Sequence, residues 1–121
     1  MRILVVEDDT VMRTVFSLML RRANYEVDVA EDGLIGVEMW EKGDYDLVLM
    51  DVQMPRMDGL EATRVIREKE RVSGGHTPIV AVTAYALKKD KGECLDAGMD
   101  DYLSKPIDFK KCIAMINAMI G

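Results

Sequence analysis

Several carboxylates of this sequence stand directly after short apolar runs. Glu7, Asp8 and Asp9 follow one such run, and Asp51 follows another, where apolar sequence passes abruptly into charge. Carboxylates gathered in one place repel one another unless a cation neutralises them or one of them takes up a proton. A hard divalent ion would remove this repulsion, so the acids predict a metal site. Asp9 is the one most readily explained as a helix-start residue.

The available side chains favour magnesium as the metal. Magnesium binds through few carboxylates and keeps several waters, which leaves positions for a phosphoryl oxygen, unlike a closed calcium cage. Zinc is disfavoured because Cys94 and Cys112 are isolated, with no CxxC spacing and no nearby histidine. We expect both cysteines to fill space, and we expect His76, the single histidine, to be a solvated loop residue.

The elements that must position these acids alternate between strand and helix patterns. Five short apolar runs alternate with five stretches of helical periodicity. The apolar runs are Ile3–Val6, Tyr25–Ala30, Leu47–Met50, Ile79–Val82 and Asp101–Leu103. The first and third runs are continuously apolar, as in strands covered on both faces of a parallel sheet. In the second run Glu26 and Asp28 alternate with apolar residues, which predicts an edge strand. The pattern predicts an α/β fold.

Each predicted helix has one side to bury. We expect that side to carry Val11, Val15, Leu18 and Arg22 in the first helix and Phe109, Cys112, Ile113 and Ile116 in the last, which we expect to run to Gly121. Capping and glycine residues mark helix ends: Asp58 with Glu61, Asp108, Gly43, Gly74 and Gly98.

Ligands of open parallel sheets bind at the carboxyl ends of the strands. The residues after the strands therefore meet at one rim, where Thr83 and the Ser104–Lys105–Pro106 segment join the acids. Thr83 alone would be a helix cap, and Lys105 alone a surface lysine. Their register with Asp51 is what makes a functional role the better interpretation.

Composition limits the remaining possibilities. A length of 121 residues, with 49% apolar and 31% charged residues, fits one globular domain. The net charge of −6 disfavours nucleic acid and anionic membranes as partners. No apolar run approaches the roughly 18 residues of a membrane span, and the N-terminus has no signal-peptide pattern. We expect a cytoplasmic chain whose residues 1–121 form one domain, with no output domain.

The sequence resembles the receiver domain of response regulators over its whole length. The resemblance rests on the Glu7–Asp8 pair, the run Asp51-Val52-Gln53-Met54-Pro55-Arg56-Met57-Asp58-Gly59, the Thr83–Ala84 pair and the run from Ala97 to Pro106. It implies a flavodoxin-like (βα)5 three-layer sandwich, with a parallel sheet in the order 2-1-3-4-5 and helices on both faces.

The resemblance also implies a role for each residue of the rim. Asp51 would be the phosphorylated aspartate; Asp8 would bind Mg²⁺ directly, Glu7 mostly through water, and Asp51 with the backbone carbonyl of Gln53 would complete the metal's protein ligands. Thr83 and Lys105 would bind the phosphoryl group, and Thr83 with Tyr102 would form the switch. Gln53 and Tyr85 occupy positions that adjust hydrolysis of the phosphoryl group in the family, and the Lys105–Pro106 bond is cis there.

Partners follow from the same resemblance. The phosphoryl donor would be a phosphohistidine on a sensor histidine kinase or a histidine phosphotransfer protein. The surface of the fourth helix, fifth strand and fifth helix would carry the output to a downstream protein, from a monomer or a phosphorylation-dependent dimer. Such a domain catalyses its own phosphorylation and is not a turnover enzyme. The amino-acid sequences of these motifs resemble those of receivers in hybrid kinases and phosphorelays. A free-standing regulator remains an open alternative.

Two other functions fit less well. A phosphatase of the haloacid-dehalogenase type also uses a strand-end aspartate and magnesium, but it expects a second aspartate where this chain has Gln53. A flavodoxin-like cofactor carrier holds phosphate in a Ser/Thr/Gly loop after the first strand, and the acids Glu7, Asp8 and Asp9 would repel that phosphate.

Overall fold

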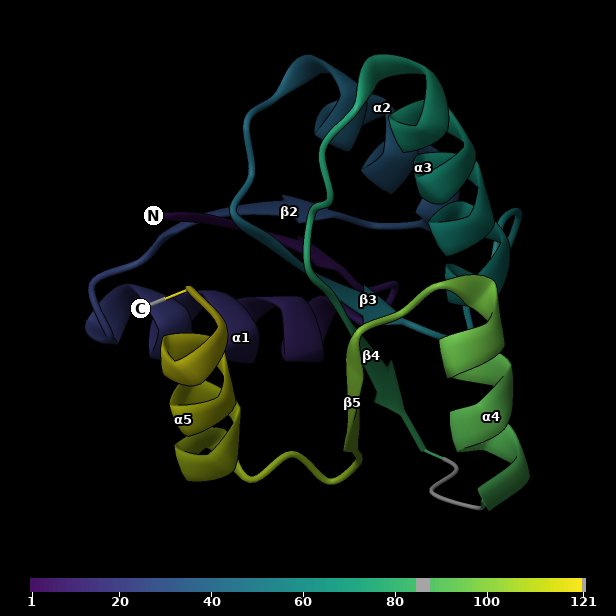
Figure 1. Cartoon of the computed structure of the whole chain (residues 1–121). Coiled ribbons are helices and arrows are strands. Elements are labelled where there is room, and N and C mark those ends of the chain that lie inside the picture. The colour runs from purple at the N-terminus through teal and green to yellow at the C-terminus, as the bar shows by residue number, and fades with distance from the viewer. Residues whose placement is uncertain (85–87, 121) are drawn as a thin grey trace.

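A computed structural model describes residues 1–84 and 88–120 of the chain. Within them strands and helices alternate from one end to the other (Figure 1). The elements are β1 (Arg2–Val6), α1 (Thr10–Arg22), β2 (Glu26–Ala30), α2 (Gly33–Lys42), β3 (Leu47–Asp51), α3 (Gly59–Ser73), β4 (Ile79–Thr83), α4 (Lys88–Ala97), β5 (Asp101–Ser104) and α5 (Phe109–Ile120). Tyr85 and Gly121 lie outside the described residues.

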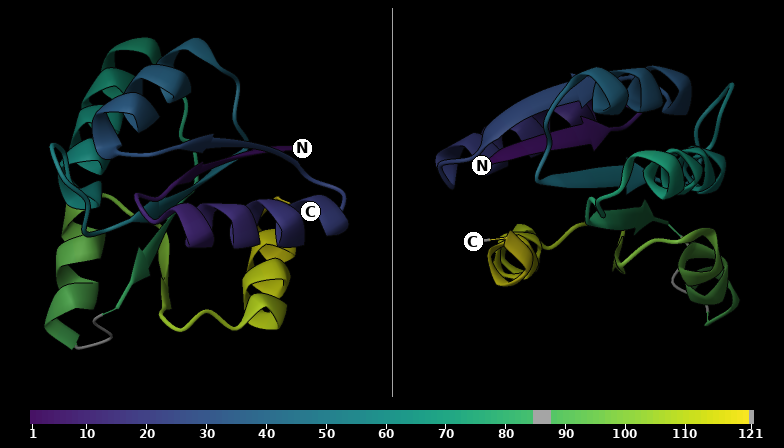
Figure 2. Two further views of the ribbon diagram at one scale, coloured as in Figure 1. Left: turned by 180° about the vertical axis from the view of Figure 1, so that it is seen from behind. Right: turned by 45° about the horizontal axis from the view of Figure 1, so that its top comes forward.

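The strands form one parallel sheet in the order β2-β1-β3-β4-β5. Helices α1 and α5 cover one face of the sheet, and α2, α3 and α4 cover the other (Figures 1 and 2). The predicted flavodoxin-like (βα)5 sandwich and its strand order are therefore confirmed. The edge position predicted for the second strand, from its alternating acids, is confirmed as well.

The sheet separates two hydrophobic cores. Phe16 and Leu20 of α1 pack with Cys112 and Ile116 of α5 on one side. Val37, Ala62, Ile66 and Cys94 pack on the other side, from α2, α3 and α4. Alternate residues of the central strands enter alternate cores, which explains why β1 and β3 are apolar at nearly every position.

The side of α1 that faces the sheet differs from the sequence prediction. Val11 and Leu18 are 69% and 58% exposed, whereas Phe16 and Leu20 are buried and Met12 packs beside them. Both sets have helical spacing, and the larger, aromatic set takes the core because it buries more apolar surface. The prediction for α5 is confirmed: Cys112 and Ile116 are fully buried, and Phe109 and Ile113 pack against the same core.

The predicted helix ends agree with the structure. The Asp58 carboxylate accepts a hydrogen bond from the backbone N–H of Glu61 at the start of α3, and Asp108 accepts bonds from the first turn of α5. Gly43 ends α2, Gly74 ends α3, and Gly98 follows α4. The positive φ of Gly74 and Gly98, 85° and 105°, explains why glycine stands there.

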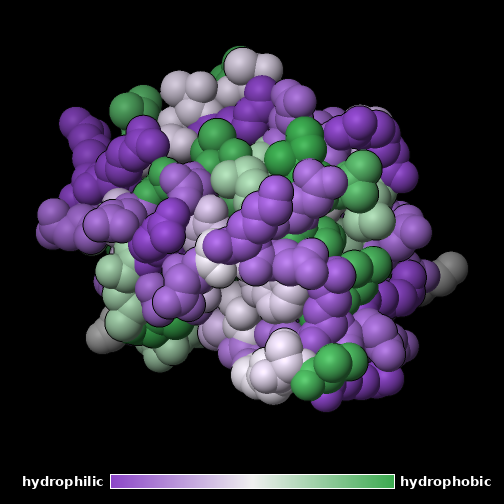
Figure 3. All heavy atoms as spheres, turned by 90° about the horizontal axis from the view of Figure 1, so that it is seen from above, coloured by the Kyte–Doolittle hydropathy of each residue, from purple (hydrophilic) through white to green (hydrophobic). Residues whose placement is uncertain are grey.

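The surface of the domain is mostly hydrophilic when it is seen from the side of α2 and α3, with hydrophobic residues scattered over it (Figure 3). Among the described helices, none combines the length and the apolar character that a membrane crossing requires. Cys94 and Cys112 are both buried and form no disulfide, as expected of space-filling residues. His76 is exposed, but it also pairs with Asp100 at 2.7 Å, which the sequence did not indicate.

Candidate functional site

The register of the sheet brings the predicted residues to one rim. Val6 pairs with Met50, so Glu7 and Asp51 follow at the same level on neighbouring strands. Asp51 pairs with Val82, which places Thr83 one residue further along β4. Thr83 pairs with Ser104, and Lys105 comes next. Four neighbouring parallel strands, β1, β3, β4 and β5, therefore position the acids, the hydroxyl and the ammonium without any long loop.

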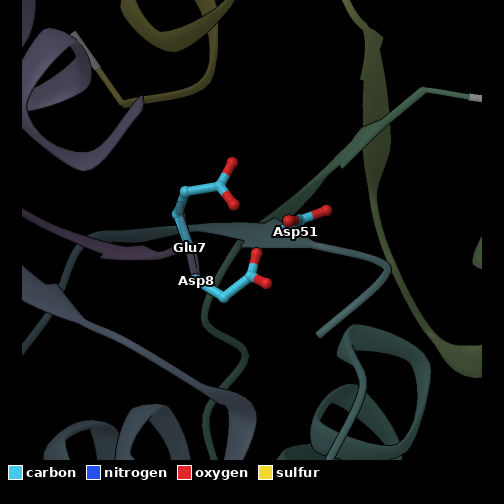
Figure 4. Close-up of side chains that lie close together, drawn as sticks. All are labelled: Glu7, Asp8 and Asp51. Carbon is cyan, nitrogen blue, oxygen red and sulfur yellow. The ribbon is translucent and has the colours of Figure 1, made fainter. Parts of the chain in front are cut away.

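Glu7, Asp8 and Asp51 form the acidic cluster of this rim (Figure 4). Each offers one carboxylate oxygen, and these three oxygens lie within 4.8 Å of one another. Glu7 and Asp51 are buried, whereas Asp8 is exposed at the mouth of the cluster. Asp9 points elsewhere: its carboxylate caps α1 by accepting bonds from the N–H groups of Val11 and Met12, as predicted for a helix-start residue.

Lys105 reaches the cluster from the loop after β5. Its Nζ lies 3.2 Å from Glu7 Oε1 and 3.5 Å from Asp51 Oδ2. The backbone N–H of Lys105 donates to the carbonyl of Thr83, which fixes the loop against β4. The Lys105–Pro106 peptide bond is cis, as the resemblance implied.

The cluster perturbs two pKa values. Burial, followed by the neighbouring Asp51 carboxylate, raises the pKa of Glu7 above its ordinary value. Burial by itself would lower the pKa of Lys105, but the charges of Asp51 and Glu7 outweigh it and raise that pKa. The cluster thus favours protonated groups and attracts further positive charge.

The donor set fits a magnesium ion. Glu7 Oε1 is buried and accepts no hydrogen bond from the described residues, and its approach to Lys105 is an ion pair only. One ammonium beside three carboxylates leaves the cluster with an excess of negative charge, which a divalent cation would offset. Three carboxylates with one of them open to solvent match the few protein ligands and several waters that magnesium prefers.

The three remaining predicted site residues lie in the loop after β3, on β4 and on β5. Gln53 follows Asp51 in the loop before α3, and its backbone N–H donates to Asp51 Oδ1 at 3.2 Å. Thr83 is buried at the end of β4. Tyr102 lies half-buried on β5, and the ammonium of Lys91 stands 4.6 Å from the centre of its ring.

Sequence reasoning missed the residues that hold the loops of the rim. Arg13 of α1 donates to the backbone carbonyls of Glu7 and Asp8, at 2.9 and 3.0 Å. Arg56 and Asp32 join two loops by an ion pair. Their partners are distant in sequence or belong to the backbone, so no short motif indicates them.

The fold and the acidic rim define a doubly wound α/β domain with a carboxylate cluster at the carboxyl edge of its sheet. Residues 3–117 match the family described as the response regulator receiver domain, and the chain belongs to that family. Receiver domains are signalling modules of two-component and phosphorelay pathways.

Individual relatives agree with this assignment. Hybrid signal transduction histidine kinase I of Dictyostelium discoideum is 41% identical over 124 residues, which are 98% of this chain and 7% of that kinase. The chain thus spans only a small part of such relatives. The receiver domain of the Pseudomonas aeruginosa sensor histidine kinase PA1611, solved with magnesium in its active-site cleft, is 42% identical with a TM-score of 0.89, covering 99% of this chain and 97% of that one.

A third relative was solved together with a partner. The receiver domain of the Saccharomyces cerevisiae response regulator Ssk1, in complex with the histidine phosphotransfer protein Ypd1, is 30% identical to this chain. The TM-score is 0.93, and the match covers 99% of this chain and 88% of that one.

Proposed function

We propose that this receiver domain accepts a phosphoryl group on Asp51 in a magnesium-dependent reaction. The observation that carries the proposal is the cluster of Glu7, Asp8 and Asp51 beside Lys105, because this set combines a buried carboxylate nucleophile with a place for a cation. Asp8 and Asp51, Glu7 through water, and the backbone carbonyl of Gln53 would hold the magnesium. The bound ion would offset negative charge on the phosphoryl oxygens.

The side chains of the chain itself orient the reaction. The Asp51 carboxylate attacks phosphorus, the N–P bond of a phosphohistidine breaks, and the imidazole nitrogen takes up a proton as it leaves. The N–H of Gln53 and the ammonium of Lys105 hold the two oxygens of Asp51 from different sides, which limits its rotation. Lys105 then offsets part of the new charge, and Thr83 supplies a hydroxyl from β4.

The proposed partners come from the relatives. A histidine phosphotransfer protein or a sensor histidine kinase would be the donor, supported by the Ssk1–Ypd1 complex and by the hybrid kinases that contain similar domains. Phosphorylation would shift Thr83 and Tyr102 and so change the α4–β5–α5 surface for a downstream protein. The domain would act without turnover of a substrate, as a monomer or a phosphorylation-dependent dimer.

We also propose that residues 1–121 form one receiver domain and that this domain works in the cytoplasm. Both cysteines are buried and outside any disulfide, which supports a reducing compartment.

Labelling with acetyl phosphate tests the proposal. We expect magnesium-dependent addition of one phosphoryl group at Asp51, detected by intact mass and peptide mapping. Asp51→Asn should abolish labelling, and Asp8→Asn should raise the magnesium concentration required. Asp9→Asn is the matched control, because asparagine keeps the helix cap while removing a neighbouring charge. Equal labelling of Asp51→Asn and the parent would exclude Asp51 as the acceptor.

A further inference from the structure

One ion pair joins the loop after β3 to the start of α2. Arg56 lies in this loop, and its guanidinium donates from Nε at 3.0 Å and from Nη2 to the same Asp32 oxygen, Oδ2. Asp32 is only 5% exposed, and its other oxygen caps α2 by accepting a bond from the N–H of Ile35 at 2.9 Å. Its two oxygens therefore hold two different segments.

The backbone of the loop needs such support. Arg56 has a φ of +66°, in the left-handed region that a residue with a side chain adopts only at a cost. The next residue passes so close to α2 that a Cβ on Gly33 would lie 2.3 Å from the carbonyl oxygen of Met57. The loop therefore lies directly on the first turn of α2, and the ion pair with Asp32 stabilises its unusual backbone.

The same loop is part of the acidic rim. It begins at Asp51, and Gln53, whose N–H donates to the Asp51 carboxylate, lies three residues before Arg56. Asp51 itself is held in the sheet by its pairing with Val82, so a shift of the loop would chiefly move the backbone of Gln53, the proposed magnesium ligand beside it. Neither Arg56 nor Asp32 belongs to the acidic cluster itself.

We propose that Arg56 is a positioning residue: through its ion pair with Asp32 it holds residues 52–58 in the conformation that binds magnesium at Asp51. This inference rests on the proposed function. A positioning role and a simple charge effect predict opposite changes in magnesium affinity when Arg56 is removed. By Coulomb's law, removing a nearby cation strengthens the binding of another cation. Loss of positioning weakens the binding of magnesium instead.

Calorimetric titration of the whole chain with magnesium alone separates the two effects. We expect Arg56→Ala to bind magnesium about three- to tenfold more weakly, below the larger losses seen for residues that directly orient metal ligands. Arg56→Gly also removes the side chain but relieves the left-handed strain, and it should bind magnesium as weakly as the alanine variant. Asp32→Asn keeps the helix cap and removes the ion pair, and it should weaken binding too.

Two controls complete the design. Arg2→Ala breaks an ion pair with Asp28, at 2.6 Å. Arg2 begins β1, away from the acidic rim at the end of that strand, so this variant should leave magnesium affinity unchanged. Arg56→Lys keeps the charge but loses the planar two-donor contact, so it should recover affinity only in part. The rate of acetyl phosphate labelling at saturating magnesium should stay within about twofold of the parent for every Arg56 variant, because affinity is lost and the chemistry is not.

The outcomes are distinguishable. If Arg56→Ala and Arg56→Gly bind magnesium as tightly as the parent, or more tightly, the positioning role is wrong. If Arg56→Lys equals the parent while the alanine variant is weak, the planar two-donor contact with Asp32 is not what holds the loop, and the role given to the guanidinium is wrong. If the parent is not labelled at Asp51, the proposed function fails whatever the Arg56 variants show.

Discussion

Glu7 is a buried carboxylate whose surroundings disfavour its charge. It is 1% exposed, its Oε1 accepts no hydrogen bond from the described residues, and its pKa is raised by burial and by Asp51. Glu7→Gln keeps the size and shape of the side chain and removes the charge. We therefore expect this variant, without magnesium, to be more stable than the parent.

The magnitude follows from the distances. Repulsion between Glu7 and Asp51, at up to 4.8 Å, is about 3.5 kcal/mol at an effective dielectric constant of about 20. Attraction between Glu7 and Lys105, at 3.2 Å, is about 5 kcal/mol on the same scale. These two energies largely offset each other, so the several kcal/mol of desolvation decide the sign. We expect a gain of about 1–2 kcal/mol in the free energy of unfolding, or roughly 4–8 °C in melting temperature.

Urea denaturation with and without magnesium measures both parts of the effect. Added magnesium should stabilise the parent and stabilise Glu7→Gln less, because the variant has lost one acid of the site. Glu70→Gln is the matched control: Glu70 is also buried, but Arg67 and the N–H of Thr77 both contact its carboxylate at 2.6 Å. That substitution should cost about 2 kcal/mol. A magnesium-free Glu7→Gln protein less stable than the parent would refute the reasoning.

The same carboxylate gives a pH dependence. Because the folded pKa of Glu7 is raised above its ordinary value of 4.5, its contribution to stability is present below that value and is lost as the pH rises through the folded pKa. Glutamine does not titrate. The stability advantage of Glu7→Gln in magnesium-free buffer should therefore grow with pH across that window, which denaturation curves at successive pH values can follow.

Three further predictions concern packing and burial. Gly59→Ala should lower the free energy of unfolding by about 2 kcal/mol and slow acetyl phosphate labelling, since a Cβ there would lie 2.1 Å from the carbonyl oxygen of Asp51; unchanged urea curves would contradict this. The hydrogen bond from Tyr45 lowers the pKa of Asp28. The stability that Asp28 adds is therefore present above the ordinary pKa of an aspartate and is lost as the pH falls through the lowered pKa of the folded protein. Asp28→Asn should remove this acid dependence in thermal melts. Burial raises the pKa of the Cys112 thiol to about 11, so iodoacetamide at pH 8 should modify it only in denaturant, as peptide mass spectrometry would show.

Much of the fold could be predicted from local patterns. The apolar runs located all five strands, and each prediction fell within one residue of the observed bounds. Several strands end one residue later than predicted because the sheet pairing continues through Asp51, Thr83 and Ser104. A polar residue at the end of a strand keeps its backbone hydrogen bonds, and hydropathy alone does not detect them.

The acidic cluster could be predicted because parallel strands bring their carboxyl ends together. The buried side of α1 could not, since two sets of residues satisfy the same helical period and only packing against α5 decides between them. The Phe16 ring meets the Phe109 ring edge-on at 5.4 Å, a contact that joins the two ends of the sequence. The ion pair of Arg56 with Asp32 was missed for a related reason, because its partners are 24 residues apart.

The two hydrophobic cores lie on opposite faces of the sheet, so a side chain that changes its packing in one core meets the other only through the strands. Tyr102 packs against the core beneath α2, α3 and α4, whereas α1 and most of α5 belong to the other. A rotation of the Tyr102 ring would therefore loosen neighbours in only one core. A change at Tyr102 would reach α1 only through the sheet, so amide exchange should change less along α1 than along α4.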